Sequence, residues 1–314
     1  MLLLRTSKKH VEGDGIDMRS ISIHLTDQCN NSCVFCVVNS HHKRKEGVNK
    51  KMIEAFLKEN AGKGYESVNI HGGEATILED FIEVLRLIKH YGYPQISLQT
   101  NARKLADSNY AKEVYDNGVN LFVVSLHGKE AEEHDTITQM SGSFQEAVEG
   151  IKNVKKLGAK VRTNTVAYKG NIQSIPEIVE LAINIGADHI NLSAIHPVGK
   201  AYENFERVVP TYRQIQQKIF EAVDVCVKRN CVVTLEGFPN CMIQGYEKFQ
   251  IDWEENEFKL LYHNFVLNNY ATFMEKETKK RVPACRQCKR KNVCGGVYKE
   301  YLEFFGDAEF KLID

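Results

Sequence analysis

Three cysteines lie within eight residues near the start of the chain, and they are the first feature that could do chemistry. Cys29, Cys33 and Cys36 are separated by three and then two residues, directly after a strand-like apolar run at residues 21–25. Thiolates are soft ligands that favour zinc or iron–sulfur clusters, which usually take four protein ligands. The fourth position here is filled from elsewhere in the chain, or is left open for a small molecule. The simplest alternative is a Cys3His zinc site completed by one of three histidines, namely His24, His41 or His42.

A second group of cysteines lies near the C-terminus. Cys285, Cys288 and Cys294 are separated by two and five residues and are followed by two glycines, a spacing that also permits half of a zinc ribbon. The chain has nine cysteines, and this odd, clustered set argues against a disulfide framework. Of the others, Cys241 stands alone, while Cys226 and Cys231 flank the end of an expected helix, where buried packing is their expected role.

Composition limits the classes of function. The 314 residues suit one large domain or a core with an appendage. Lys and Arg together number 41, as do Asp and Glu, so no net charge attracts nucleic acid or an anionic membrane. The apolar run at residues 2–4 is too short for a signal peptide, and no stretch approaches the roughly 20 apolar residues that span a bilayer. We therefore expect a cytoplasmic protein that binds neither membrane nor nucleic acid.

Strand and helix patterns alternate through the first two thirds of the chain. Six short apolar runs predict strands, and five segments with helical spacing of apolar residues separate them. The expected strands are 21–25, 67–70, 95–99, 120–125, 160–167 and 189–194, and the expected helices are 48–61, 78–90, 104–117, 143–157 and 174–185. This alternation predicts an α/β fold of parallel βαβ units. Either a doubly wound sheet or a partial (β/α)6 barrel, similar to the TIM barrel, satisfies it.

The alternation stops after residue 200. A long helix is expected at 211–229 and a short strand at 231–235, while residues 236–294 look irregular with only modest helix between 255 and 280. Such a segment needs something other than a large apolar core to order it, and a metal cluster can supply that constraint. We expect an N-terminal extension (1–18), a core (19–230) and a C-terminal cluster-bearing domain (231–314). The aromatic residues after the last cysteines predict a helix that anchors the C-terminus to the barrel, namely Tyr298, Tyr301, Phe304 and Phe305.

Polar and glycine residues follow the expected strands. In parallel α/β folds, ligands bind at the carboxyl ends of the strands. The residues at these ends include the first cysteine group, Gly72, Gly73, Glu74, Thr100, Asn101, Ser125, His127, Asn164 and His196. The sequence therefore predicts one binding site at this edge of the sheet.

The cysteine triplet after the first strand, together with Gly72-Gly73-Glu74 after the second, resembles the radical S-adenosylmethionine (radical SAM) superfamily. The resemblance implies that the three cysteines hold a 4Fe–4S cluster whose fourth iron binds S-adenosylmethionine. It also implies roles for further residues around that cofactor. These are close backbone approach at Gly72 and Gly73, a partner for the ammonium group at Glu74, packing of Phe35 on the adenine, polar contacts from Thr100, Asn101, Ser125 and Asn164, and backbone contact at His196.

The second cysteine group resembles the SPASM region of such enzymes, or its shorter twitch form. The resemblance implies that Cys241, Cys285, Cys288 and Cys294 ligate one auxiliary 4Fe–4S cluster, which serves electron transfer if all four bind it. The spacing departs from that of the best-known twitch enzymes. No catalytic side chain is identified; His127 and His71 are candidates by position alone.

The resemblance implies reductive cleavage of S-adenosylmethionine to a 5′-deoxyadenosyl radical that abstracts hydrogen from a substrate, with an electron donor such as flavodoxin or ferredoxin. We expect the substrate to be a small metabolite, sugar or nucleotide. The alternative is a maturase of a ribosomally made peptide, which is disfavoured because only about eighteen residues precede the first strand. A non-catalytic iron–sulfur electron carrier is the alternative from another class, and it would not need Gly72-Gly73-Glu74.

Overall fold

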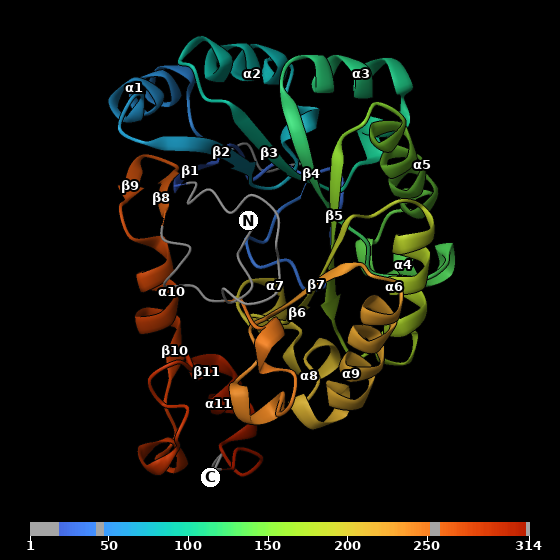
Figure 1. The fold of residues 1–314 in the computed structure, drawn as a ribbon, viewed down its shortest axis with the longest axis vertical. Coiled ribbons are helices and arrows are strands. Elements are labelled where there is room, and N and C mark those ends of the chain that lie inside the picture. The colour runs from blue at the N-terminus through green and yellow to red at the C-terminus, as the bar shows by residue number, and fades with distance from the viewer. Residues whose placement is uncertain (1–18, 42–46, 252–257, 312–314) are drawn as a thin grey trace.

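One curved sheet organises the protein (Figure 1). The computed structural model describes residues 19–41, 47–251 and 258–311. The strands follow the order β7-β6-β5-β4-β3-β2-β1-β8-β9, and all neighbours are parallel except β8 and β9. Their bounds are β1 Arg19–His24, β2 Tyr65–His71, β3 Gln95–Thr100, β4 Val119–Ser125, β5 Lys160–Ala167, β6 His189–Ala194, β7 Val232–Glu236, β8 Phe258–Tyr262 and β9 Phe265–Leu267.

The order of the strands decides between the two expected architectures. A doubly wound sheet reverses its strand order at a switch point, whereas β1 to β7 lie side by side in chain order. The protein is therefore an α/β partial barrel, as one of the two expectations had it. All six strands predicted before residue 200 are present, with end shifts of a few residues.

Helices form the outer layer of the barrel (Figure 1). In α5, for example, Ala147, Ile151 and Val154 have no exposed surface because this face packs inward. Among the described residues, no helix is both long and apolar enough to cross a bilayer. The helices are α1 Lys50–Asn60, α2 Phe81–His90, α3 Ser108–Asp116, α4 Ala131–Thr138, α5 Ser143–Lys156, α6 Ile175–Asn184, α7 Lys200–Glu203, α8 Phe205–Val208, α9 Tyr212–Lys228, α10 Tyr270–Thr278 and α11 Lys299–Phe305.

The segment after residue 236 is more regular than the sequence predicts. β8 pairs in parallel with β1, and β9 folds back against β8 as a hairpin, so the chain returns to the opposite edge of the sheet from β7. The expectation of only modest helix here was wrong for this hairpin. A five-residue strand whose partner lies more than 200 residues away has little local signal, because the pairing alone defines it. α4 was also missed: its eight residues include Glu132, Glu133 and Asp135 and carry only a weak apolar face.

The C-terminal helix α11 packs through part of its aromatic face. Tyr298 and Tyr301 are buried, and the Phe304 ring stacks on Phe205 of α8 with centroids 3.8 Å apart. Short strands β10 (Lys279–Lys280) and β11 (Val297–Tyr298) pair antiparallel and bring the residues on either side of the second cysteine group together. The helix α11 is thereby held against the barrel, as the aromatic pattern predicts.

We expect Phe122→Ala to lower the free energy of unfolding by about 3–5 kcal/mol, because the β4 side chain has no exposed surface and its loss leaves a cavity. Phe265→Ala is the matched control: this β9 side chain is 51% exposed, and its loss should change stability by about 0.5 kcal/mol or less. Anaerobic urea denaturation followed by circular dichroism measures both. Equal losses would contradict the proposed core.

Candidate active site

The three-cysteine loop follows β1 and is held at the carboxyl edge of the barrel. Ser32 N donates to Thr138 O (2.9 Å) and Val34 N donates to Ile137 O (3.0 Å), so the loop is bonded to the end of α4. On its other side, Lys200 N donates to Cys36 O at 3.0 Å. The helix that the sequence did not reveal is therefore one support of this loop.

The cysteine sulfurs are set up as metal ligands rather than as a disulfide. All three thiols are free. Backbone amides donate to two of them: Asn31 N to Cys29 Sγ and Ser40 N to Cys36 Sγ, both at 3.3 Å. Burial, followed by the nearby Glu74 carboxylate, raises the pKa of the Cys29 thiol to about 12. A cation that replaces the proton relieves this cost, and amide donors to sulfur are typical of cluster sites, so the donor set fits an iron–sulfur cluster.

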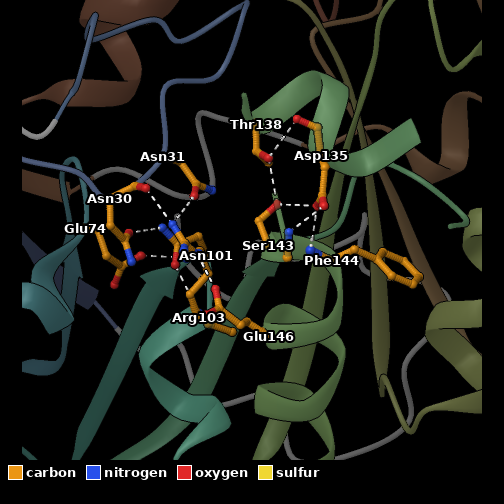
Figure 2. A network of polar contacts seen from close by, with 12 residues as sticks. Asn30, Asn31, Glu74, Asn101, Arg103, Asp135, Thr138, Ser143, Phe144 and Glu146 are labelled. Carbon is orange, nitrogen blue, oxygen red and sulfur yellow. Dashed lines mark hydrogen bonds and ion pairs between the residues drawn. The ribbon is translucent and has the colours of Figure 1, made fainter. Parts of the chain in front are cut away.

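Figure 2 shows how the loop is joined to β3 and α5. Arg103 Nη1 donates to the backbone oxygen of Asn30 (2.5 Å) and to Asn31 Oδ1 (3.0 Å), and its Nε pairs with Glu146 of α5. Asn101 Nδ2 donates to Asn30 Oδ1 at 2.7 Å. The guanidinium group of Arg103 is therefore occupied by its hydrogen bonds to the loop, and the Glu146 carboxylate balances its charge.

The same figure shows how α4 meets α5. Asp135 accepts from Gly142 N (2.7 Å), Ser143 Oγ (2.8 Å) and Phe144 N (2.9 Å), which satisfies amides at the start of α5. Burial alone would raise the pKa of Asp135, but these hydrogen bonds lower it overall. The cap fixes α4 against α5, and α4 in turn supports the cysteine loop.

Glu74 lies beneath the site and not on its wall. Its carboxylate is fully buried and accepts from Thr100 Oγ1 (2.8 Å), Asn101 N (2.6 Å) and both the N and Oγ1 of Thr76 (3.2 and 2.6 Å). We expected it to face an ammonium group. The geometry instead makes it the anchor that orients Thr100 and Asn101.

The two glycines before Glu74 touch the cysteine loop directly. Gly73 N donates to Thr26 O (2.5 Å) and Glu74 N donates to Gln28 O (2.7 Å). A Cβ at Gly73 would overlap the Gln28 carbonyl oxygen, and one at Gly72, whose φ is +146°, would overlap that of Thr26. Only glycine allows this approach between the end of β2 and the loop.

A cavity of about 630 Å³ opens beside the loop, inside the carboxyl end of the barrel. Its walls include the three cysteines and every other predicted site residue of the core except Glu74. These residues are Phe35, His71, Gly72, Gly73, Thr100, Asn101, Ser125, His127, Asn164 and His196. Strand register explains the convergence, because Ser125 lies opposite Asn164 and Asn164 lies opposite Asn191 in neighbouring strands.

The two candidate catalytic histidines are neutral near pH 7. Burial lowers the pKa of His127 to about 3 and that of His71 well below its usual value. Val166 N donates to His127 Nδ1 at 3.3 Å, so the ring proton lies on Nε2 and the ring is a hydrogen-bond donor there. The edge of the ring meets Phe35 with centroids 5.2 Å apart. His127 is thus arranged to position a ligand more readily than to take up a proton.

Of the three histidines in the zinc alternative, His24 is shown with another side-chain partner. His24 Nε2 lies 2.6 Å from Asp27 Oδ1, which also lies 3.3 Å from His263 Nε2. The backbone oxygen of His41 accepts from Cys29 N at 3.4 Å, and His42 lies outside the described residues.

His196, predicted to contact the cofactor through its backbone, stacks on Tyr298 with ring centroids 4.3 Å apart, and burial lowers its pKa to about 4.

Sequence reasoning missed two parts of the cavity wall. One is Glu236 at the carboxyl end of β7, with Asn191 and Ser193 of β6 behind it. The rule that strand ends carry binding groups would have identified Glu236. The other is the apolar side formed by β8, β9 and α10, which no local pattern places near β1. It includes Phe258, Leu260, Tyr262, Tyr270, Phe273 and Met274.

The second cysteine group surrounds a separate small cavity. Cys241, Cys285, Cys288 and Cys294 all line a space of about 20 Å³. Asn240 N donates to Cys294 Sγ at 3.5 Å, and burial, followed by the other cysteines, raises the pKa of Cys241 to about 12. The four thiols are free, and cysteine thiolates are the ligands that iron–sulfur clusters take. Cys226, in contrast, is fully buried in the core.

A parallel partial barrel with a three-cysteine loop at the mouth of a deep cavity defines a class of cluster-dependent enzymes. Residues 23–182, just over half of the chain, match the family described as the Radical SAM superfamily. The chain belongs to this superfamily, and it is an enzyme that uses a 4Fe–4S cluster and S-adenosylmethionine.

Curated relatives include the probable GTP 3′,8-cyclases of Sulfurisphaera tokodaii (30% identical over 193 residues, 61% of each chain) and Saccharolobus islandicus (33% over 190 residues, 59% of each). The chain thus matches only about 60% of the length of these relatives. Among solved structures, Streptococcus suis SuiB bound to S-adenosylmethionine has a TM-score of 0.68 at 15% identity, covering 95% of this chain and 76% of that one. The enzyme anSMEcpe with bound AdoMet has a TM-score of 0.62 at 16% identity, covering 94% and 93%. At these identities the likeness shows the fold.

We expect Gly73→Ala to weaken S-adenosylmethionine binding by about tenfold or more, because the added methyl group displaces the loop at the Gln28 carbonyl. Gly92→Ala is the control: no atom lies within 4 Å of its added Cβ, and its φ of +80°, which strains alanine, makes it a test of backbone strain away from the site. Equilibrium dialysis of the anaerobic holoenzyme measures the affinity. Unchanged binding in Gly73→Ala would show that the close approach is not needed.

Proposed function

We propose that this chain cleaves S-adenosylmethionine reductively at a 4Fe–4S cluster held by Cys29, Cys33 and Cys36, and passes the radical to an organic substrate. The observation that carries the proposal is the position of these cysteines, which lie on one loop and line the cavity together with Gly72 and Gly73. When bound, the cluster and S-adenosylmethionine supply the electron and the 5′-deoxyadenosyl radical that abstracts hydrogen. Membership in the superfamily removes the alternative of a non-catalytic electron carrier.

The residues of the chain orient the cofactor and exclude water. The backbone at Gly72 and Gly73 faces the cavity without side chains, which leaves room for the methionyl group. Phe35, 7% exposed, offers a ring face for the adenine, and Ser125, Asn164 and the backbone at His196 offer polar contacts. Glu74 acts through Thr100 and Asn101, which it holds by hydrogen bonds.

We propose that Cys241, Cys285, Cys288 and Cys294 bind an auxiliary 4Fe–4S cluster that takes the electron left after hydrogen abstraction. Support comes from their shared cavity and from β10 and β11, which join the ends of this segment beside the barrel. On this proposal residues 19–230 form the core and 231–314 the cluster-bearing part, although β7 continues the core sheet. An electron donor such as flavodoxin or ferredoxin supplies the first cluster.

For the substrate, the size of the cavity supports a small organic molecule such as a metabolite, sugar or nucleotide bound beside the cofactor. The curated relatives are named as GTP cyclases, which agrees with a small molecule. A peptide is the second candidate, because the β8–α10 wall adds an apolar side to the cavity that suits a side chain. Two structural neighbours, SuiB and anSMEcpe, have been solved with a bound peptide.

We expect the anaerobically reconstituted protein to form 5′-deoxyadenosine when it is given dithionite and S-adenosylmethionine. Cys33→Ala should lose this product, because it removes a thiolate ligand of the first cluster. Cys226→Ala is the matched control, since that buried cysteine lies in the core away from both groups, and its product should persist. Chromatography of the quenched reaction measures the nucleoside. A wild-type protein with full iron content but no product would overturn the proposed function.

We expect about eight iron atoms in each wild-type chain and about four in Cys241→Ala, because the substitution removes one of four ligands to the auxiliary cluster. Iron and sulfide analysis after anaerobic reconstitution measures both. Cys231→Ala, which changes a half-buried cysteine outside both groups, should keep about eight. An unchanged count in Cys241→Ala would remove that residue from the cluster.

A further inference from the structure

The cavity wall has an unusual charge for a relative of GTP-binding enzymes. Among the described residues that line it, none is Arg or Lys, and Glu236 is the one carboxylate. A triphosphate carries several negative charges, and protein sites neutralise them with Arg, Lys, a metal or a helix N-terminus. The described wall offers the opposite sign.

Cations close to the cavity are turned to other partners. Arg103 holds the cysteine loop and Glu146, and Lys200 Nζ donates to Ser32 Oγ at 2.7 Å. Lys279 is 9% exposed and lies behind Tyr298, with Nζ 5.4 Å from the centroid of that ring. None of the three lines the cavity.

The histidines do not supply the missing charge. Burial lowers the pKa of His134 and of His196 to about 4 and that of His127 to about 3. His24 and His71, on the wall near β1, are also lowered by burial. All five rings are therefore neutral near pH 7, so Glu236 carries the one formal charge on the described wall. Its cationic neighbours, Arg162 and Lys279, lie behind that wall.

Glu236 is held with one oxygen turned to partners and the other available. Its Oε2 accepts from Asn191 Nδ2 (3.0 Å) and lies 3.2 Å from Ser193 Oγ. Its Oε1 accepts no hydrogen bond from any described residue, although the side chain lines the cavity. The carboxylate thus presents an acceptor to a ligand.

The direction of this network is fixed from deep in the barrel. Arg162 Nη2 can only donate, and it reaches Thr234 Oγ1 at 3.4 Å. Thr234 Oγ1 therefore donates onward to Asn191 Oδ1 at 2.7 Å. This leaves the Asn191 amide nitrogen to donate to Asn164 Oδ1 (2.7 Å) and to Glu236. Both acceptors are tied, so the Asn164 NH₂ group and the second oxygen of Glu236 are left outside this network, on two residues that line the cavity.

We propose that the substrate is an amine without phosphate groups, whose aliphatic or aromatic body packs on the β8–α10 wall while its ammonium group donates to Glu236. The proposal rests on the proposed function and names the substrate class of that site. Tyr270 lines the same cavity, and an aromatic ring close to an ammonium group favours the cation. A free amine and the ammonium-bearing side chain of a peptide share this chemistry.

The first experiment compares GTP with guanosine on the anaerobic holoenzyme in the presence of S-adenosylmethionine, by equilibrium dialysis. Binding of S-adenosylmethionine is measured first, and its absence would count against the proposed function and not against the substrate class. We expect GTP to bind no more tightly than guanosine, or not at all. GTP binding that is about tenfold tighter than that of guanosine would overturn the proposal, because phosphates would then contribute affinity.

The second experiment measures binding of n-butylamine by calorimetry, with an expected dissociation constant on the order of millimolar for so small a ligand. In Glu236→Gln we expect the affinity to fall about tenfold, because a hydrogen bond to a charged group is lost. Glu149→Gln, an exposed carboxylate on α5, is the charge-matched control and should bind as the wild type does. Glu236→Asp keeps the charge and should recover part of the affinity even if Glu236→Gln folds poorly.

N-acetyl-L-lysinamide, which carries the same ammonium on a capped residue, distinguishes the two sources. Tighter binding than n-butylamine supports the proposal with a peptide as the source, and equal binding supports it with a free amine. No binding of either probe to the wild type, or equal binding by the wild type and Glu236→Gln, would overturn it.

Discussion

The structure depends on a contact between two chain segments at the carboxyl edge of β1 and β2. Gly72 and Gly73 meet the backbone of the loop that begins at Thr26, so closely that any side chain would overlap a carbonyl oxygen. The amides of Gly73 and Glu74 donate to that same loop. The cysteine loop is therefore fixed by backbone geometry on one side, by α4 on another and by Arg103 from β3's end. Each of these supports comes from a different βα unit, so the loop is held only where these units come together.

Glu74 acts on the site indirectly, by accepting hydrogen bonds from Thr100 and Asn101. A fully buried carboxylate is costly unless it is hydrogen-bonded, and Glu74 has four donors from Thr76, Thr100 and Asn101. Burial raises its pKa overall, and these donors offset part of that rise. The hydrogen bonds to Glu74 therefore join the ends of β2 and β3. They fix the backbone of Asn101, whose side chain in turn donates to Asn30 in the cysteine loop.

The far side of the cavity is formed by the segment that follows β7 and returns to the sheet beside β1. β8 joins the edge of β1, the hairpin and α10 supply an apolar wall, and β7 supplies Glu236 at the opposite edge. Curated relatives that match the barrel sequence are named for GTP, whereas the described wall here carries one carboxylate and no cation. The residues that we propose for the cofactor and those that we propose for the substrate thus come from different parts of the chain.

The sequence by itself determined the class of protein and the first cluster site. Cys29, Cys33, Cys36 and the glycines before Glu74 are local motifs, and six strands with helical spacers are local patterns, so their meaning does not depend on distant chain. The strand-end rule also placed Ser125, Asn164 and His127 on one cavity. Only the tertiary structure decided between a barrel and a doubly wound sheet, because strand order is a property of pairing. It also decided the direction of Glu74 and the place of β8, and it brought out Glu236 through a hydrogen-bond network that spans β5, β6 and β7. Those features arise from contacts between residues far apart in the chain, and no local pattern encodes them.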